Sequence, residues 1–109
     1  MPRILYPRGS GAATGAVPPG CVEVHRWASW AEVRVWMDTE ATHIPLGIGR
    51  DTRRVYVTWP GAVRPGGTGD HRIEFYIPAE ALKDAGVGLM ILDHWGNLPI
   101  YNVRIVCPD

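Results

Sequence analysis

The sequence predicts an α+β fold: a small single domain with a mixed, mostly antiparallel (split) sheet and one or two short helices. Residues 71–77 and 100–107 alternate polar and apolar side chains, as half-buried strands do. Residues 55–58 form a β-branched and aromatic run that predicts another strand. A capping box at residues 29–32 marks the start of a helix. Strands and helices that do not alternate regularly are typical of the α+β class.

The chain of 109 residues fits one domain. Residues 1–20 are rich in Gly, Ala and Pro, which predicts a linker or N-terminal arm and leaves residues 21–109 as the single domain. Residues 21–27 alternate as a strand, with Arg26 toward the core and His25 on the opposite face. The helix is expected to begin near Trp30 and to end around residues 38–40.

Turn residues divide the middle of the chain. Residues 43–51 read as a loop, and Pro-Gly at residues 60–61 ends the strand at 55–58. The glycine-rich stretch up to residue 69 is a long loop that leads into the strand at 71–77.

The last third of the chain is expected to return to the sheet. Proline at the start and glycine at the end predict a short helix over residues 78–86. Residues 87–92 are apolar enough for a strand, residues 93–97 contain turn formers, and residues 100–107 form the closing strand.

Composition limits the function classes. The formal net charge is zero, so we expect no broad electrostatic attraction to nucleic acid or to anionic lipid, and neither DNA nor a membrane is an expected partner. No apolar run approaches the roughly 20 residues that span a bilayer, and the N-terminus has no signal-peptide core. No Cys/His spacing indicates a metal site, and a disulfide between Cys21 and Cys107 stays open at this point.

Two residues of the first strand are candidates for a site. Arg26 offers a rigid, permanently charged fork for a phosphate or carboxylate, although an ion pair with Glu23 or Glu74 is the structural alternative. His25 is a candidate general base or ribose ligand, and a hydrogen-bonded structural histidine is its alternative.

Three residues of later strands are also candidates. Tyr56 and Thr58 share a face of their strand, where a ring stacks on a planar base and a hydroxyl donates to it, unless both only pack in the sheet. Glu74 lies opposite its apolar neighbours, with Arg72 or Arg104 as its expected cross-strand partner.

The segments HRWASWAE, RRVYVT, PGAVRPGGTG, RIEFYIP and LPIYNVRI resemble the C-terminal toxin domains of Rhs-type bacterial polymorphic toxins. Within that group, the chain is similar to ADP-ribosyltransferase-like toxins over most of residues 22–106. The resemblance implies an enzyme that uses NAD to ADP-ribosylate a target-cell macromolecule, or hydrolyses NAD. It also implies a secreted effector that acts in the target-cell cytoplasm and has a cognate immunity protein.

The resemblance assigns roles to residues. Arg26 corresponds to the arginine that anchors the dinucleotide, with Ser29 near the same turn, and Tyr56 and Thr58 match the strand that supports the nicotinamide. Such enzymes carry a catalytic glutamate late in the chain, but in this sequence no glutamate follows Glu80. The carboxylate role therefore goes to Glu74, with Asp93 as the next candidate. Arg26 and Glu74 are the predicted catalytic residues, and NAD is the predicted substrate without any metal.

Two other functions stay open. One is a metal-independent ribonuclease toxin in which His25, His43, His71 or His94 acts with Arg26 or Arg72 on RNA. The other is a non-catalytic binding or immunity module that uses the five tryptophans as an interface. The target, a protein or RNA, the parent protein and the oligomeric state do not follow from the sequence.

Overall fold

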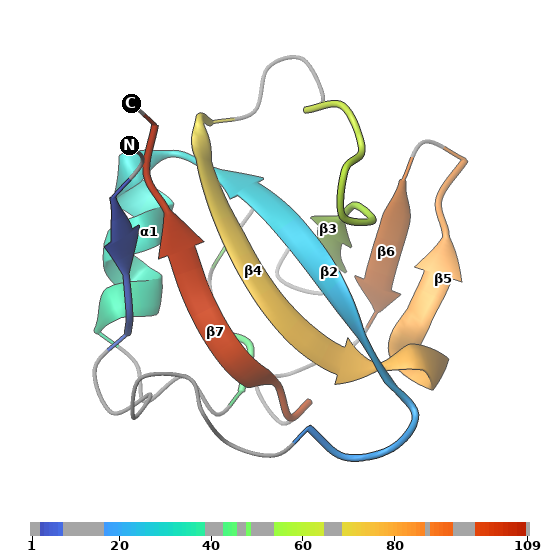
Figure 1. The fold of residues 1–109 in the computed structure, drawn as a ribbon. Helices are drawn as coiled ribbons and strands as arrows, with labels where there is room; N and C mark the ends of the chain where they lie inside the picture. Colours follow the sequence, from blue (N-terminus) through green and yellow to red (C-terminus); the bar gives the residue numbers. More distant parts are fainter. Residues whose placement is uncertain are drawn as a thin grey trace.

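Within the part of the chain that the structure describes, two antiparallel sheets and one α-helix make up the fold (Figure 1). The computed structural model describes residues 3–7, 17–38, 43–45, 48, 54–64, 69–86, 88–92 and 98–108. The larger sheet has the order β1 (Ile4–Leu5), β7 (Tyr101–Val106), β4 (His71–Pro78) and β2 (Cys21–Ala28). The smaller sheet has the order β3 (Arg54–Val57), β6 (Leu89–Leu92) and β5 (Leu82–Asp84). The predicted α+β class with mostly antiparallel strands is confirmed.

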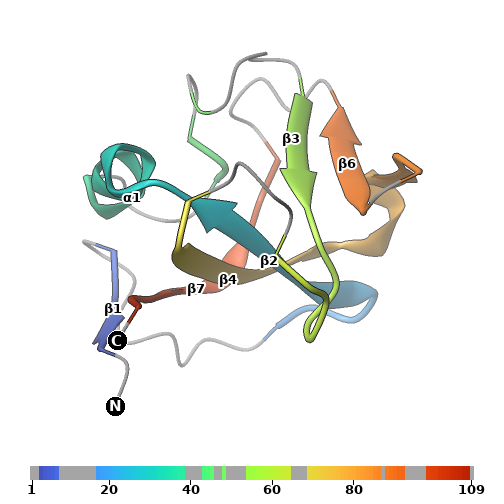
Figure 2. The same ribbon diagram turned by 90° about the horizontal axis from the view of Figure 1, so that it is seen from above.

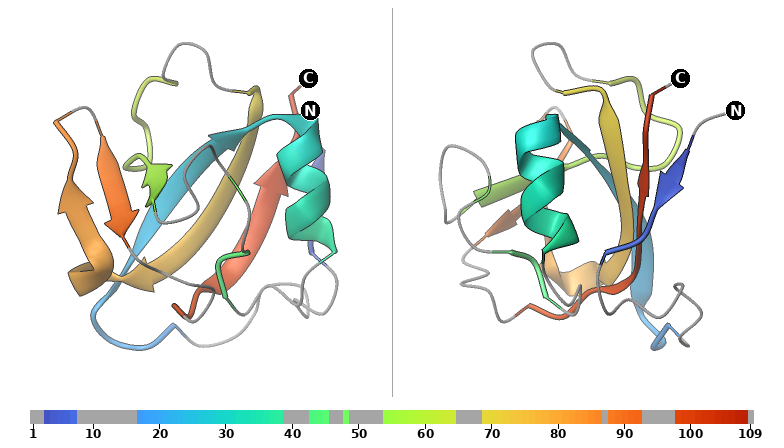
Figure 3. Two further views of the ribbon diagram at one scale, coloured as in Figure 1. Left: turned by 180° about the vertical axis from the view of Figure 1, so that it is seen from behind. Right: turned by 90° about the vertical axis from the view of Figure 1, so that its left-hand side faces the viewer.

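One face of the larger sheet is covered and the other is open. Helix α1 (Trp30–Met37) and the smaller sheet lie on the same side of β2, β4 and β7, as Figures 2 and 3 show. No described helix or strand lies over the opposite face.

Helix α1 begins where the capping box predicts. The Ser29 hydroxyl accepts a hydrogen bond from the backbone amide of Glu32 at 3.4 Å, which satisfies one free amide of the first turn. Val33 and Trp36 are fully buried and form the core face of the helix. None of the described helices is long and apolar enough to cross a membrane.

The prediction of a helix over residues 78–86 is wrong. Only Ala79–Ala81 form a short 3-10 turn, η2, and the chain then continues as β5. Leu82 of β5 pairs with Ile91 of β6. Hydrogen bonds across the smaller sheet thus satisfy the backbone groups that a helix would have satisfied internally.

The N-terminal arm contains a strand that the composition does not predict. Ile4 and Leu5 of β1 pair with Val106 and Ile105 of β7, and the Arg3 carbonyl accepts a hydrogen bond from the Cys107 amide at 2.8 Å. This part of the arm therefore belongs to the larger sheet as its edge strand. Residues 8–16 of the arm lie outside the described residues.

The core fills the space between the covered face of the larger sheet, α1 and the smaller sheet. Trp36 of α1 packs on Phe75 of β4 with ring centroids 5.4 Å apart. Each of the three parts contributes buried apolar side chains. The larger sheet provides Val24, Ile73, Phe75, Val103 and Ile105, α1 provides Val33 and Trp36, and the smaller sheet provides Val55, Val57 and Ile91. Because side chains alternate along a strand, the residues between these positions on β2, β4 and β7 point to the open face.

Cys21 and Cys107 are both free thiols. Cys21 pairs with Pro78 at one end of β4, whereas Val106, next to Cys107, pairs with Arg72 near the other end. Those two positions on β4 are about 20 Å apart at the usual rise of a strand. Since a disulfide requires Cα atoms within about 7 Å of each other, the register keeps the two cysteines apart.

Candidate functional site

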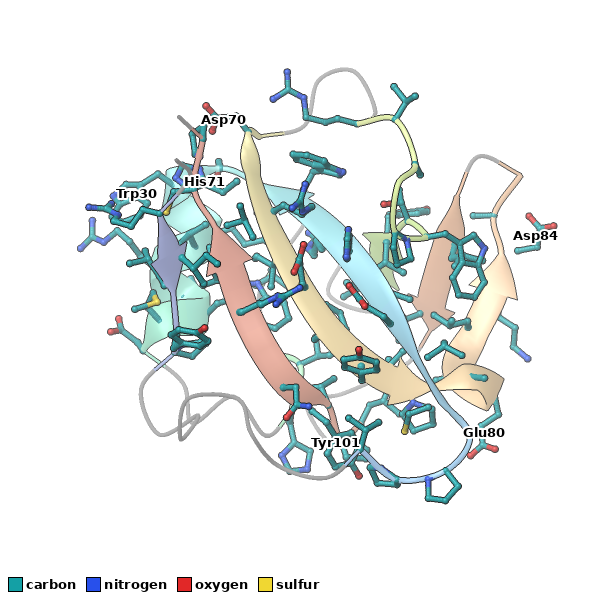
Figure 4. All side chains as sticks on the ribbon, in the orientation of Figure 1. Trp30, Asp70, His71, Glu80, Asp84 and Tyr101 are labelled. Carbon is teal, nitrogen blue, oxygen red and sulfur yellow. The ribbon has the colours of Figure 1, made fainter. Side chains whose placement is uncertain are left out.

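Charged and aromatic side chains gather on the open face of the larger sheet, which Figure 4 shows from the front. Residues paired across antiparallel strands share a face of the sheet. The register pairs His25 with Glu74, Glu74 with Arg104, Trp27 with Arg72, and Glu23 with Tyr76. Strands β2, β4 and β7 thus bring two carboxylates, an imidazole, two guanidinium groups and two aromatic rings onto one surface. We call these seven residues the polar face.

Glu74 is the buried centre of the polar face, with a side chain only 5% exposed. Its carboxylate accepts hydrogen bonds from Nε of Arg72, at 2.7 Å, and from Nε of Arg104. Burial raises the pKa of Glu74, but the hydrogen bonds from Arg104 and Arg72 and the nearby charge of His25 outweigh it. The net pKa of Glu74 lies below its ordinary value of 4.5, so the group is a carboxylate at neutral pH.

His25 is fixed between two carboxylates. Its Nε2 atom lies 2.7 Å from Oε2 of Glu23 and 3.5 Å from Oε2 of Glu74. The Tyr76 hydroxyl lies 3.3 Å from the other oxygen of Glu23, so Glu23 is itself held in place. The backbone of His25 forms a bridge with Thr58, with hydrogen bonds of 2.9 and 2.7 Å. The imidazole therefore has a defined position beside an ionised carboxylate.

The two arginines keep donors for a ligand. Arg72 and Arg104 are 35% and 47% exposed, and each uses only Nε to bind Glu74. Among the described residues, no hydrogen bond is formed by their terminal Nη nitrogens. The hydrogen bond to Glu74 raises the pKa of Arg104, which keeps it charged. The pair offers two forked cations, the geometry that binds phosphate oxygens.

Trp27 lies at the end of the polar face nearest the loop after β3. Its ring is 5.7 Å from the guanidinium carbon of Arg72 and 5.8 Å from that of Arg64. Both distances are within the range of cation–π attraction. The Trp27 Nε1 atom is buried and has no hydrogen-bond partner among the described residues. Such an unsatisfied donor costs about 1–3 kcal/mol, and it makes Trp27 a distinct feature of this surface.

A cavity of about 160 Å³ opens beside Glu74. It is lined by Glu23, Glu74, Phe75, Tyr76, Asn102 and Arg104. The cavity gives a small ligand access to the carboxylate although Glu74 itself is almost fully buried.

The structure does not bring the two predicted catalytic residues together. Arg26 pairs with Ile73 and lies on the covered face of the sheet, as the alternation predicted, whereas Glu74 lies on the open face. The guanidinium of Arg26 donates two hydrogen bonds of 2.7 Å to Glu32 of α1 and one of 2.8 Å to the Tyr56 carbonyl. This fork is occupied within the protein, and it ties α1 to both sheets.

The other predicted NAD-binding residues also separate. Ser29 caps α1, and Thr58 is buried and hydrogen-bonds to the His25 carbonyl at 3.3 Å. The Tyr56 side chain is 50% exposed and belongs to the smaller sheet. Of the six site residues predicted from the sequence, His25 and Glu74 share the open face.

The remaining histidines lie elsewhere. His71 has its ring centroid 5.5 Å from that of Trp30 and its Nδ1 atom 3.0 Å from Asp70, at the edge of the molecule labelled in Figure 4. His43 is exposed and forms an isolated bridge with Pro99. His94, together with Asp93 and the rest of residues 93–97, lies outside the described residues, as do residues 65–68 of the glycine-rich loop.

Glu23, His25 and Glu74 each place a donor atom within 4.8 Å of the others, a spacing that a metal ion can use. Two guanidinium groups bind Glu74 directly, however, and their positive charge opposes a divalent cation at the same carboxylate.

No family model, curated protein or solved structure gives a significant match to this chain. The chemistry proposed for the site is therefore argued from the polar face and its cavity. Glu23, Tyr76 and Asn102 are residues of this site that were not predicted from the sequence. The strand alternation contained a signal for Glu23, which shares a face with His25, and for Asn102, which shares a face with Arg104.

Proposed function

We propose that this chain is a metal-independent ribonuclease. The observation that supports this most is the group formed by His25, Glu74, Arg72 and Arg104, in which an imidazole lies 3.5 Å from a carboxylate that two guanidinium groups bind. RNA cleavage through its own 2′-hydroxyl requires a general base, a general acid and positive charge near the phosphate. The open face offers a residue for each requirement.

The roles follow from the positions of these groups. Glu74 accepts the proton of the 2′-hydroxyl, and that oxygen attacks the neighbouring phosphorus while the bond to the 5′-oxygen breaks. Protonated His25 gives a proton to the leaving 5′-oxygen, so one proton is taken up and one is released. Arg72 and Arg104 bind the non-bridging oxygens and stabilise the charge that develops on them. The products are a 2′,3′-cyclic phosphate and a free 5′-hydroxyl.

The arginines also adjust the strength of the base. Burial raises the pKa of Glu74, and the hydrogen bonds from Arg104 and Arg72 lower it. When a phosphate attracts these guanidinium groups, their hold on Glu74 weakens and the effect of burial prevails. The pKa of Glu74 then rises toward the range of an effective general base, at the moment when substrate is bound.

The setting of the reaction comes from the resemblance of the sequence to Rhs-type toxin domains. In this proposal the chain is a secreted effector that cleaves RNA in the target-cell cytoplasm, and a cognate immunity protein protects the producing cell. Expression in a bacterial host then inhibits growth only while His25 and Glu74 are intact.

ADP-ribosyl transfer or NAD hydrolysis is the second candidate, and Glu74 supports it. An ionised carboxylate on a sheet stabilises the cation that develops when nicotinamide leaves the ribose. Because Glu32 occupies the fork of Arg26, the NAD phosphates would have to bind Arg72 and Arg104 instead. The ribonuclease is the better-supported function because this second reaction gives His25 no chemical role.

The test is cleavage of a defined single-stranded RNA by the purified protein in EDTA, with NAD turnover measured in parallel. His25→Gln and Glu74→Gln are each expected to lower the cleavage rate by roughly 10²–10⁴-fold. The matched controls His43→Gln and Glu80→Gln change exposed residues of the same types and are expected to cleave as the wild type does.

The products and the parallel assay decide between the candidates. Mass spectrometry is expected to find 2′,3′-cyclic phosphate ends on the fragments. RNA that stays intact while NAD is consumed, with NAD turnover lost in Glu74→Gln, would replace the ribonuclease with the second candidate. Cleavage that His25→Gln leaves unchanged would refute the roles of His25 as acid and Glu74 as base.

A further inference from the structure

The cavity beside Glu74 has the size of a small planar group. Its volume is about 160 Å³. Pockets for drug-sized ligands are larger, at about 300–1,000 Å³. Tyr76 supplies an aromatic wall, and Glu23 and Asn102 supply polar groups. An aromatic wall with a few polar groups is how proteins hold an unstacked base of single-stranded RNA.

Asn102 lines this cavity on the same face of β7 as Arg104, beside a β-bulge. Glu74 pairs with Arg104, but Tyr76 pairs with Tyr101, so β7 has one extra residue between these two pairs. Asn102 lies in that interval with φ of 54°, a left-handed conformation that asparagine tolerates better than most residues. Bulges redirect side chains and occur often beside active sites. The Asn102 side chain forms no hydrogen bond with any described residue, so its amide is available to a ligand.

Glu23 has acceptor sites left. An ionised carboxylate has about four acceptor sites and no donor. His25 uses one oxygen and the Tyr76 hydroxyl contacts the other, which leaves about two sites. A group that presents two neighbouring N–H donors satisfies both.

We propose that this cavity is a base-binding subsite that selects guanine. Guanine is the RNA base whose Watson–Crick edge carries two adjacent donors, N1–H and the N2 amino group, beside the O6 acceptor. The donors match the remaining acceptor sites of Glu23, and O6 matches the amide nitrogen of Asn102. Adenine, cytosine and uracil each put an acceptor where one of these donors belongs, and an acceptor facing a carboxylate is rejected.

The position of the cavity fixes the cleavage site, and this step depends on the proposed ribonuclease function. Glu74 and Arg104 line the same cavity. A guanosine with its base in the cavity therefore has its ribose beside Glu74 and its 3′-phosphate beside the arginines. Cleavage is expected on the 3′ side of guanosine.

Two Asn102 variants test the subsite. Asn102→Gly removes the amide and accepts the same left-handed backbone, whereas Asn102→Asp keeps the shape but sets a carboxylate against O6. The rate of cleavage is measured on oligonucleotides with one guanosine, adenosine, cytidine or uridine at the cleavage position. The wild type is expected to favour guanosine, and both variants are expected to lower the ratio of guanosine to adenosine cleavage by roughly tenfold or more, because adenine has an amino donor where guanine has O6.

A binding measurement keeps this inference separate from the ribonuclease itself. Isothermal calorimetry with the 3′-monophosphates of the four nucleosides is expected to give the tightest binding for guanosine, and Asn102→Asp is expected to weaken it. Selective guanosine binding without RNA cleavage would retain the subsite and reject the ribonuclease. Three results would overturn the subsite. They are cleavage without base preference, a base preference that both Asn102 variants leave unchanged, and equal binding of all four nucleotides.

Discussion

The buried ion pair of Arg26 and Glu32 gives a direct test of whether Arg26 serves structure or a ligand. Their side chains are only 10% and 13% exposed and share two hydrogen bonds of 2.7 Å. Arg26→Ala leaves the Glu32 carboxylate with the Trp36 Nε1 donor at 3.1 Å, and it removes the donor to the Tyr56 carbonyl. Removing one partner of a buried pair costs about 3–5 kcal/mol, so we expect a loss of that size in the free energy of unfolding.

A double-mutant cycle isolates the pair. Once one partner is absent, removing the other costs much less, so Arg26→Ala and Glu32→Ala together are expected to show a coupling of about 2–3 kcal/mol. Urea unfolding followed by tryptophan fluorescence measures these values, because Trp36 lies in the core beside the pair. Arg34→Ala, on the exposed side of α1, is the control and is expected to change stability by less than about 0.5 kcal/mol.

The cycle also has a result that would refute the structural role. If Arg26→Ala unfolds within about 1 kcal/mol of the wild type and yet abolishes activity on RNA or NAD, then the arginine serves a ligand and its structural assignment fails. If it destabilises strongly and the residual folded protein stays active, the dinucleotide anchor implied by the resemblance is excluded for this residue.

Two further predictions concern stability. The pKa of Glu74 is lower in the folded protein than its ordinary value of 4.5, so its contribution to stability is present above that pH and is lost as the pH falls through the folded pKa. Between pH 7 and pH 3, the urea midpoint is expected to fall less steeply for Glu74→Gln than for the wild type. Equal slopes for the two proteins would contradict the lowered pKa of Glu74. A Cβ atom at Gly69 would overlap the backbone of Ala28 and Ser29, whereas at Gly61, with φ of 84°, it meets open space. Gly61→Ala is expected to cost about 1–2 kcal/mol from its backbone conformation alone, and Gly69→Ala more than about 3 kcal/mol, because the junction between β2 and α1 must move. Urea midpoints of the two variants measure this difference, and equal losses would show that the junction yields.

Several features of the site follow from local sequence patterns. The alternation of β2 predicted Arg26 on the core side and His25 on the other side, and the structure confirms both. The alternation of β4 likewise predicted Glu74 opposite Ile73, with Arg72 or Arg104 as partner, and both arginines bind it. These predictions succeed because the two-residue period of a strand is a property of the backbone itself.

Other features depend on contacts between distant segments. The sequence left Arg26 with Glu23 or Glu74 as its ionic partner, but the packing of α1 on the sheet supplies Glu32 instead. Residues 82–84 lie in a segment with a helix-like sequence, but they pair with the edge of β6 and form β5. In both cases the deciding neighbour is set by packing rather than by local preference.

The sequence by itself determined the fold class, the capped helix and the side of each strand on which a residue lies, because these depend on neighbours a few positions away. Only the tertiary structure decided which faces meet. The register of β2, β4 and β7 joins His25 to Glu74 and Glu74 to Arg104, and it brings Asn102 of β7 to the same cavity as Glu23 of β2. A shift of one residue in that register would turn each of these side chains to the other face, so the site is a consequence of long-range pairing.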